Sequence, residues 1–235
     1  MAQNKLQRFE DIRNFPNVYE YPQGMKSNWN ATHFKNSNPI TLELACGKGE
    51  YATGLGTLHP NRNFIGVDIK GNRIWVGARK ALNENLSNVA FLRTQIDKIA
   101  DYFAPGEVSE IWITFPDPQL RMSKAKKRLT HPLFLRRYQQ IIAPGGTVNL
   151  KTDSPDLYRF TKMVINLYNL ELITDFDNLY SLPEISPELR IKTHYESLDI
   201  AGSNRVHYLS FKIDRELPLE KDEILKQMIR DESAD

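Results

Sequence analysis

The stretch ITLELACGKGE, residues 40–50, determines the fold class that this sequence predicts. Its apolar beginning, Ile40 to Leu44, is typical of a buried strand, and a helical pattern from Glu50 to Leu58 follows at once. The glycines between them leave the backbone open to a ligand, and the first turn of the helix offers unpaired N–H groups. We therefore expect a strand–turn–helix unit that binds a small molecule.

Short apolar runs alternate with helical patterns through the rest of the chain. This alternation predicts βαβ units with right-handed crossovers, and hence a doubly wound α/β fold with a parallel sheet. Two late strands, 172–176 and 206–213, favour closure of the sheet by an antiparallel strand near its edge. The other predicted strands are 40–44, 63–69, 89–94, 110–115 and 147–151, and the predicted helices are 50–58, 72–85, 96–103, 132–142 and 156–168.

The chain divides into three parts and has no internal repeats. Residues 1–38 are polar and interrupted by prolines, which predicts a loosely packed N-terminal arm. Residues 39–214 form the predicted core domain, in which the irregular stretch 177–204 is long enough to indicate a functional loop. Residues 215–235 predict a C-terminal helix of the same domain. Its expected inward-facing residues are Ile224, Leu225, Met228 and Ile229.

Composition excludes several classes of protein. The 235 residues include one cysteine, Cys46, which allows neither an internal disulfide nor a multi-cysteine metal site. The five histidines lack metal-ligand spacing, so we expect no metal. No apolar run reaches the roughly 18 residues of a membrane span, and the first residues lack the apolar core of a signal peptide. We expect a cytoplasmic protein.

The formal net charge of +2 conceals an uneven distribution. Between Asp117 and Asp153 there are eight basic residues and no acidic one, which leaves 23 basic and 29 acidic residues elsewhere, a net charge of −6. Such a cluster is either a solvated face or a surface that contacts the phosphates of a nucleic acid. We call these residues the basic window: Arg121, Lys124, Lys126, Lys127, Arg128, Arg136, Arg137 and Lys151.

Acidic residues at two strand ends indicate the kind of ligand. Asp68 ends the second strand, where a carboxylate can accept both hydroxyls of a ribose. The dinucleotide pattern G-x-G-x-x-G is absent, because Ala45 stands at its first position before Gly47, and Glu50 stands where the third glycine would fall. Glu43, before the turn, would repel a pyrophosphate but not a cationic amine. We therefore interpret Gly47, Gly49, Glu43 and Asp68 as binding S-adenosylmethionine rather than a nicotinamide cofactor, with a structural role for either carboxylate as the alternative.

Two further carboxylates are predicted at the same edge of the sheet. Asp117 and Asp153 follow the fourth and fifth predicted strands, and open α/β sheets bind ligands at the carboxyl ends of their strands. Either residue could instead cap a turn or a helix. Two prolines stiffen the backbone around Asp117, which is our candidate for the catalytic residue.

Six motifs occur in a fixed order along the chain. They are Glu43…Gly47-Lys48-Gly49, Gly66-Val67-Asp68, Phe115-Pro116-Asp117-Pro118, Arg128-Leu129-Thr130, Lys151-Thr152-Asp153 and Thr193-His194-Tyr195-Glu196. With this set, the sequence resembles the bacterial tRNA (guanine-N7)-methyltransferase family from about Ile40 to Ile213.

The resemblance implies a Rossmann-like class I methyltransferase domain that acts on tRNA. Its reaction would transfer a methyl group from S-adenosylmethionine to N7 of the guanine at position 46, in the variable loop. By motif position, the cofactor would contact Glu43, Asp68, Gln95 and Asp117. The tRNA guanosine would contact Arg121, Asp153, Thr193 and Glu196.

The chain departs from the family pattern at two places. Gln119-Leu120-Arg121 replaces the usual Trp-Pro-Lys, so the positive charge is kept while the aromatic ring is not, and Gln95 replaces an acidic residue. The alternative functions are another S-adenosylmethionine-dependent methyltransferase and a tRNA-binding subunit without catalysis. We expect a monomer or homodimer that needs no other protein partner.

Overall fold

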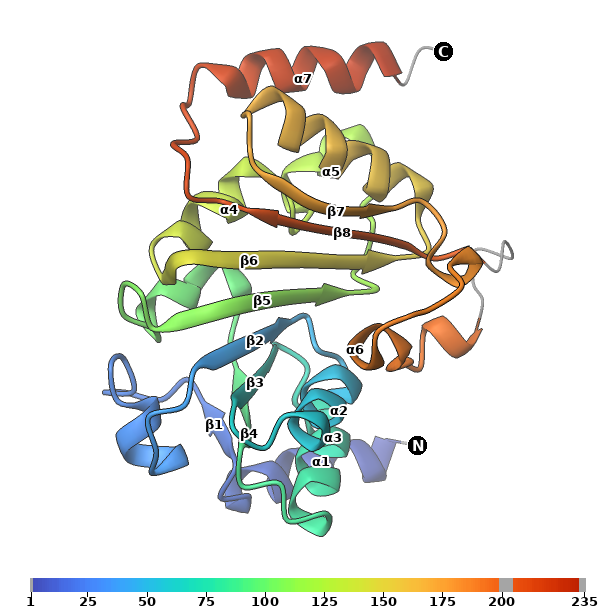
Figure 1. Cartoon of the computed structure of the whole chain (residues 1–235). Helices are drawn as coiled ribbons and strands as arrows, with labels where there is room; N and C mark the ends of the chain where they lie inside the picture. The colour runs from blue at the N-terminus through green and yellow to red at the C-terminus, as the bar shows by residue number, and fades with distance from the viewer. Residues whose placement is uncertain (1, 199–204, 233–235) are drawn as a thin grey trace.

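The computed structural model describes residues 2–198 and 205–232, and within them the chain forms one eight-stranded sheet (Figure 1). The strand order is β1-β4-β3-β2-β5-β6-β8-β7. Neighbouring strands are parallel from β1 to β6, whereas β8 is antiparallel to both β6 and β7. The strands are β1 (Val18–Glu20), β2 (Ile40–Leu44), β3 (Asn63–Asp68), β4 (Val89–Arg93), β5 (Val108–Thr114), β6 (Ile142–Thr152), β7 (Leu172–Phe176) and β8 (His207–Lys212).

The predicted doubly wound α/β fold, with its closing antiparallel strand, is therefore confirmed. Helices cover both faces of the sheet, because the buried apolar side chains form two separate clusters. One cluster joins α4, α5 and α7 to the sheet, and the other joins α2, α3 and α6 to it. The helices are α1 (Ala2–Asn14), α2 (Glu50–Leu58), α3 (Gly71–Asn83), α4 (Pro132–Gln139), α5 (Pro155–Leu167), α6 (Pro187–Arg190) and α7 (Lys221–Glu232).

The largest differences from the predicted elements lie at two places. The helix expected at 96–103 is a 3-10 helix of six residues, Ile96–Asp101. Strand β6 begins at Ile142, earlier than the predicted 147, so α4 ends sooner than expected. No helix in the described part of the chain is both long and apolar enough to cross a membrane.

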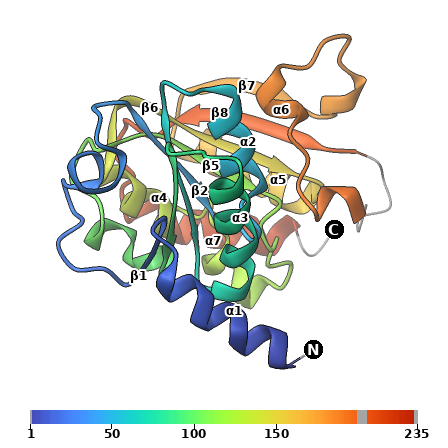
Figure 2. The ribbon, with the colours of Figure 1, turned by 90° about the horizontal axis from the view of Figure 1, so that it is seen from below.

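The prediction of a loosely packed arm at residues 1–38 is wrong for the residues that the structure describes. Helix α1 packs beside α3 (Figure 2), and β1 adds a parallel edge strand to β4. Trp29 is fully buried, stacks on Phe103 and donates its indole N–H to the Tyr102 carbonyl at 2.9 Å. The prediction failed because these contacts are to residues far away in the sequence, so they leave no local periodicity.

A C-terminal helix is present, but it begins at Lys221 rather than at 215, and residues 233–235 of the prediction lie outside the described residues. Only half of its predicted inward face is buried. In α7, Leu225 and Ile229 are buried, whereas Ile224 is 52% exposed and Met228 is 36% exposed. Residues four apart share one stripe of a helix, and their preceding neighbours lie about 100° around it. A single stripe is enough here because α7 packs mainly against α5.

A glycine in α3 lets this helix approach the ligand-binding turn. A Cβ atom added at Gly77 would lie 2.4 Å from the Lys48 carbonyl oxygen and 2.7 Å from the Phe91 ring. The carbonyl belongs to the turn between β2 and α2, so Gly77 sets the distance between α3 and that turn.

We expect Gly77→Ala to destabilise the protein, although alanine favours a helix over glycine by about 1 kcal/mol. Overpacking against a backbone carbonyl costs about 1–3 kcal/mol, which outweighs that preference. Urea unfolding measures the difference, with Lys80→Ala at an exposed position of the same helix as the control. If Gly77→Ala is as stable as the control variant or more so, the close approach is not a constraint.

Candidate active site

A cavity of about 850 Å³ lies along the carboxyl ends of the parallel strands. Segments that follow five strands contribute to its wall, as expected for a ligand site of an open α/β sheet. The wall includes Ala45 to Gly47 after β2, Asp68 at the end of β3, Thr94 and Gln95 after β4, Phe115 to Asp117 after β5, Asp153 after β6, and Thr193 and Tyr195 from the loop before β8.

The turn after β2 is held in place by the carboxylate of Asp68. Asp68 accepts the Gly47 N–H at 2.9 Å and the Lys70 N–H at 2.8 Å, so it ties the ends of β2 and β3 together. Gly47 has left-handed backbone (φ 56°), and an added Cβ would find only Tyr195, at 3.9 Å. Gly47 is therefore open to the cavity.

Gly49 serves packing rather than the cavity wall. Its φ of 69° is also left-handed, and an added Cβ would lie 2.4 Å from the Phe91 ring. It does not line the cavity. The two glycines of the turn are thus required for different reasons.

Glu43 lies beneath the turn and does not line the cavity. Its carboxylate accepts the Ala52 N–H at 2.8 Å and the Thr114 hydroxyl at 3.1 Å. Burial raises the pKa of Glu43 to about 8, and the nearby charges of Glu50 and Asp68 add to this, while the two hydrogen bonds oppose it. The group therefore holds the first turn of α2 against β5 from behind.

The cavity wall fits a nucleoside with a cationic amino-acid tail. Thr94 is fully buried, and its hydroxyl has no hydrogen-bond partner among the described residues, although it belongs to the wall. Gln95 and Asp97 add an amide and a carboxylate on the same side, and Ile69 and Ile96 add apolar surface. Such a mixture of apolar surface with a few polar groups is typical of small-molecule sites.

The segment that follows β5 also lines the cavity, and its backbone is strained. Phe115 has a φ of 46°, which is unusual for a bulky residue and more so before a proline. Asp117, two residues on, is exposed and accepts the Gln119 N–H at 3.0 Å. Asp153, at the end of β6, lines this cavity and also a smaller one of about 290 Å³ next to it. Backbone strain of this kind occurs mostly at functional sites.

Residues 177–198, between β7 and β8, contribute to the cavity wall, and we call them the covering loop. One buried lysine of β6 holds this loop in place. The Lys151 Nζ lies 3.0 Å from Glu196 Oε2 and donates to the carbonyls of Leu189 at 2.9 Å and Ile191 at 3.0 Å. Tyr180 donates its hydroxyl to the other oxygen of Glu196. The placement of Lys151 in a surface patch is therefore wrong, because its side chain is completely buried.

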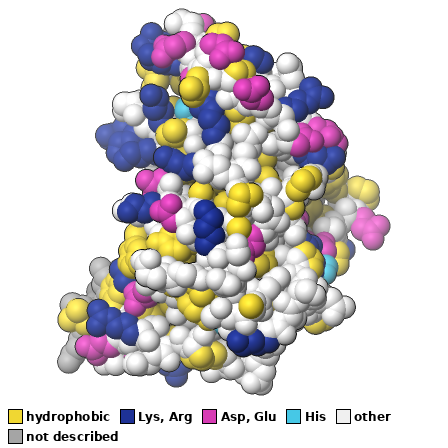
Figure 3. Space-filling model, turned by 90° about the vertical axis from the view of Figure 1, so that its left-hand side faces the viewer, with side chains coloured by type: hydrophobic (Ala, Val, Ile, Leu, Met, Phe, Trp, Pro, Cys, Tyr) yellow, Lys and Arg dark blue, Asp and Glu magenta, His cyan; other side chains and the backbone are white. Residues whose placement is uncertain are grey.

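The basic window is smaller on the surface than in the sequence. Arg128 is also buried, with its guanidinium 4.5 Å from the Phe160 ring centre, and Arg136 pairs with Asp222 at 2.6 Å. The exposed remainder on the 3-10 helix Met122–Lys127 and just before it consists of Arg121, Lys124, Lys126 and Lys127. Arg121 does not line the cavity. On the face at the amino ends of the parallel strands, by contrast, charges of both signs are intermixed (Figure 3).

Several residues of the wall were not identified from the sequence. Thr94 and Asp97 follow β4, whereas Lys70 and Arg73 follow β3. The guanidinium of Arg73 lies 5.3 Å from the ring centre of Tyr195, so α3 contacts the covering loop across the cavity. Their positions just after parallel strands were the available signal, because all such segments meet at one edge of the sheet.

Solved structures share this fold. The 16S rRNA methyltransferase KamB aligns with a TM-score of 0.59 at 13% identity, over 80% of this chain and 94% of that chain. A 16S rRNA (adenine(1408)-N(1))-methyltransferase from Catenulisporales acidiphilia, crystallised with its cosubstrate S-adenosylmethionine, aligns with a TM-score of 0.52 at 15% identity, over 82% and 93%. The fold is therefore that of the class I S-adenosylmethionine-dependent methyltransferases.

Sequence comparison identifies the family within this class. A family model described as a putative methyltransferase matches residues 37–208. Proteins named tRNA (guanine-N(7)-)-methyltransferase are 43% identical in Bacteroides thetaiotaomicron, over 95% of this chain and 91% of that protein, and 45% identical in Porphyromonas gingivalis, over 85% and 86%. The chain belongs to the tRNA (guanine-N7)-methyltransferase family.

The burial of Glu43 predicts a pH-dependent stability. In the folded protein its pKa is about 8, whereas the ordinary value is 4.5. The folded state is therefore favoured most below the ordinary value, and this advantage is lost as the pH rises toward about 8. Glu43→Gln should remove this loss. The melting temperature of the variant minus that of the wild type should therefore increase as the pH rises from about 5 to about 8.

Thermal unfolding across this pH range measures the effect, with Glu84→Gln at an exposed position as the control. An identical pH dependence of Glu43→Gln and the wild type would mean that Glu43 is ionised in the native protein.

Proposed function

We propose that this protein transfers a methyl group from S-adenosylmethionine to N7 of guanine in tRNA, at position 46 of the variable loop. The observation that carries the proposal is the cavity itself. Its wall joins the glycine turn and Asp68 to the carboxylates that follow β5 and β6. Membership of the family adds the substrate and the atom that is methylated.

The cofactor is assigned to the half of the cavity formed by β2, β3 and β4. Asp68 keeps a second lone pair on each oxygen for the ribose hydroxyls, and the open backbone at Gly47 leaves room for the amino-acid tail. Gln95 and the unpaired hydroxyl of Thr94 suit the polar atoms of adenine. We assign supporting roles to Glu43 and Gly49, which position the turn from behind.

The chemistry requires alignment more than acid or base catalysis. Bound S-adenosylmethionine supplies a methyl group on a positively charged sulfur. N7 of guanine carries a lone pair and no proton, so no residue has to act as a general base. The protein must therefore orient the base and exclude water, which is catalysis by proximity. Asp117, in the segment after β5, positions the reacting groups, and its carboxylate stabilises the positive charge that develops on guanine.

The guanosine is assigned to the smaller cavity beside the covering loop, where this cavity meets the larger one at Phe115 and Asp153. Asp153 and Glu196 can accept hydrogen bonds from the N1 and N2 donors of guanine. Thr193, on the covering loop, also lines the larger cavity. The hydroxyl of Thr193 accepts the Glu196 N–H at 3.1 Å, which keeps these two residues together. Arg121 and the exposed lysines after it supply contacts to tRNA phosphates.

The proposed function also bears on the cellular location and the oligomeric state of the protein. A tRNA substrate and a single, buried cysteine are consistent with the cytoplasm. A monomer or homodimer without another protein partner remains our expectation. Domain limits at 39–214, with 215–235 as an accessory helix, also remain proposals.

Methyl transfer from labelled S-adenosylmethionine to unmodified tRNA tests the function. We expect label in a transcript with guanine at position 46, recovered as 7-methylguanosine after digestion. A transcript with adenine at that position should stay unlabelled. Equal labelling of both transcripts would contradict the proposed site of methylation, and no labelling of either would contradict the activity.

Asp117→Ala should lower the rate of methyl transfer by about 100-fold or more, because small errors of alignment have effects of this size. Binding of tRNA should persist, since the basic residues that contact phosphates are unchanged. Single-turnover assays and filter binding separate the two effects, and Asp101→Ala at an exposed position is the control. A normal rate in Asp117→Ala would remove Asp117 from the reaction.

A further inference from the structure

A second, smaller cavity adjoins the cofactor cavity and shares Phe115 and Asp153 with it. Its volume is about 290 Å³, and its remaining wall comes from the covering loop and the start of β8. These wall residues are Tyr180, Lys192, Glu196, Arg205 and Val206.

The inner part of this cavity is formed by a buried, hydrogen-bonded carboxylate. The carboxylate of Glu196 is held on one oxygen by Lys151 and on the other by Tyr180, and its side chain is only 4% exposed. Because the buried Lys151 pairs with Glu196, Glu196 adds little net charge to the inner wall, and Asp153 is a further carboxylate there. Aromatic side chains beside fixed hydrogen-bond acceptors suit a purine base better than a phosphate.

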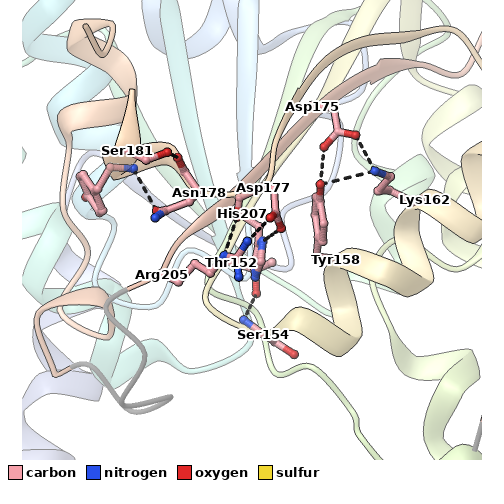
Figure 4. A network of polar contacts seen from close by, with 11 residues as sticks. Thr152, Ser154, Tyr158, Lys162, Asp175, Asp177, Asn178, Ser181, Arg205 and His207 are labelled. Carbon is pink, nitrogen blue, oxygen red and sulfur yellow. Dashed lines mark hydrogen bonds and ion pairs between the residues drawn. The ribbon is translucent and has the colours of Figure 1, made fainter. Parts of the chain in front are cut away.

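The outer part has the opposite character. Lys192 is exposed, and its Nζ lies 5.4 Å from the ring centre of Tyr180, at the rim of the cavity. Arg205 lines the same cavity from the segment just before β8, where it forms an ion pair with Asp177 (Figure 4). Both partners of that pair are about half exposed, at 48% and 57%, so the pair is screened by water.

We propose that Lys192 and Arg205 form a phosphate clamp at the mouth of the second cavity. The clamp binds the RNA backbone phosphates on either side of the nucleotide whose base enters the cavity. This inference rests on the proposed function, and it adds a tRNA contact outside the basic window. The two cations lie on the covering loop and beside β8, whereas the exposed basic window follows β5.

The clamp explains how one base is selected for insertion. Phosphate contacts set the register of a nucleic acid, and contacts to the base read its identity. With the backbone held at the rim, the flipped base reaches the inner wall at Phe115 and Asp153. These two residues also line the cofactor cavity, so the base and the methyl group meet there.

Neutralising each cation tests the clamp. We expect Lys192→Gln and Arg205→Gln each to weaken tRNA binding roughly tenfold, as for the loss of one charged hydrogen bond. The slope of log K against log salt should fall by about one for each variant. The affinity for S-adenosylmethionine should stay near the wild-type value. Arg159→Gln, which removes an exposed cation that pairs with Asp156 and Glu232, is the matched control.

Asp177→Asn separates phosphate binding from a structural role of the Arg205 ion pair. The variant breaks the pair but leaves the charge of Arg205, so the clamp predicts tRNA binding equal to or tighter than that of the wild type. If the pair only stabilises the loop, Asp177→Asn will weaken binding as much as Arg205→Gln does. That result would overturn the clamp.

Failure of the clamp and failure of the proposed function are distinguishable. If the wild type methylates tRNA and both cation variants bind it like Arg159→Gln, the clamp alone is wrong. If the wild type does not methylate tRNA, the function is wrong. Filter binding then still tests the clamp directly, because unchanged binding and salt dependence in the two variants would refute it.

Discussion

The rest of the site depends on the contacts that the buried ammonium group of Lys151 makes with the covering loop. It is fully buried at the end of β6, where an unpaired charge would cost several kcal/mol. Glu196 and the carbonyls of Leu189 and Ile191 offset that cost, and all three belong to the covering loop. One side chain of the sheet therefore fixes the loop that forms one side of both cavities. Burial lowers the pKa of Lys151, while the charge of Glu196 opposes this shift.

The division of the site into two cavities follows from the end of β5. The Phe115 N–H donates to the Lys151 carbonyl at 2.8 Å, which places the strained residue next to the buried ammonium. Phe115 lines both the larger cavity, assigned to the cofactor, and the smaller one, assigned to the base. Strain at such a point typically costs about 1–3 kcal/mol and persists only where the surroundings enforce it. The pairing of β5 with β6 and the two following prolines supply that enforcement.

Local patterns allowed much of this fold and site to be predicted. Strand β2 and helix α2 were found at their observed limits, because a buried strand and an amphipathic helix each have their own periodicity. The edge position of Asp68, Asp117 and Asp153 followed from parallel strand order alone. By contrast, the β1 strand has only three residues, and its pairing with β4 cannot be recognised without the partner.

The sequence by itself determined the alternating elements, the glycine turn and the edge of the sheet at which the acidic residues gather. Only the tertiary structure decided which charges reach that edge. Glu43 lies beneath the turn, and Lys151 and Arg128 are buried although they look like members of a basic surface. The tertiary structure also brings Lys192 and Arg205 together in the wall of the smaller cavity. The physical reason is that periodicity reflects contacts between near neighbours, whereas burial and ion pairing depend on segments that meet only when the sheet and the covering loop have folded.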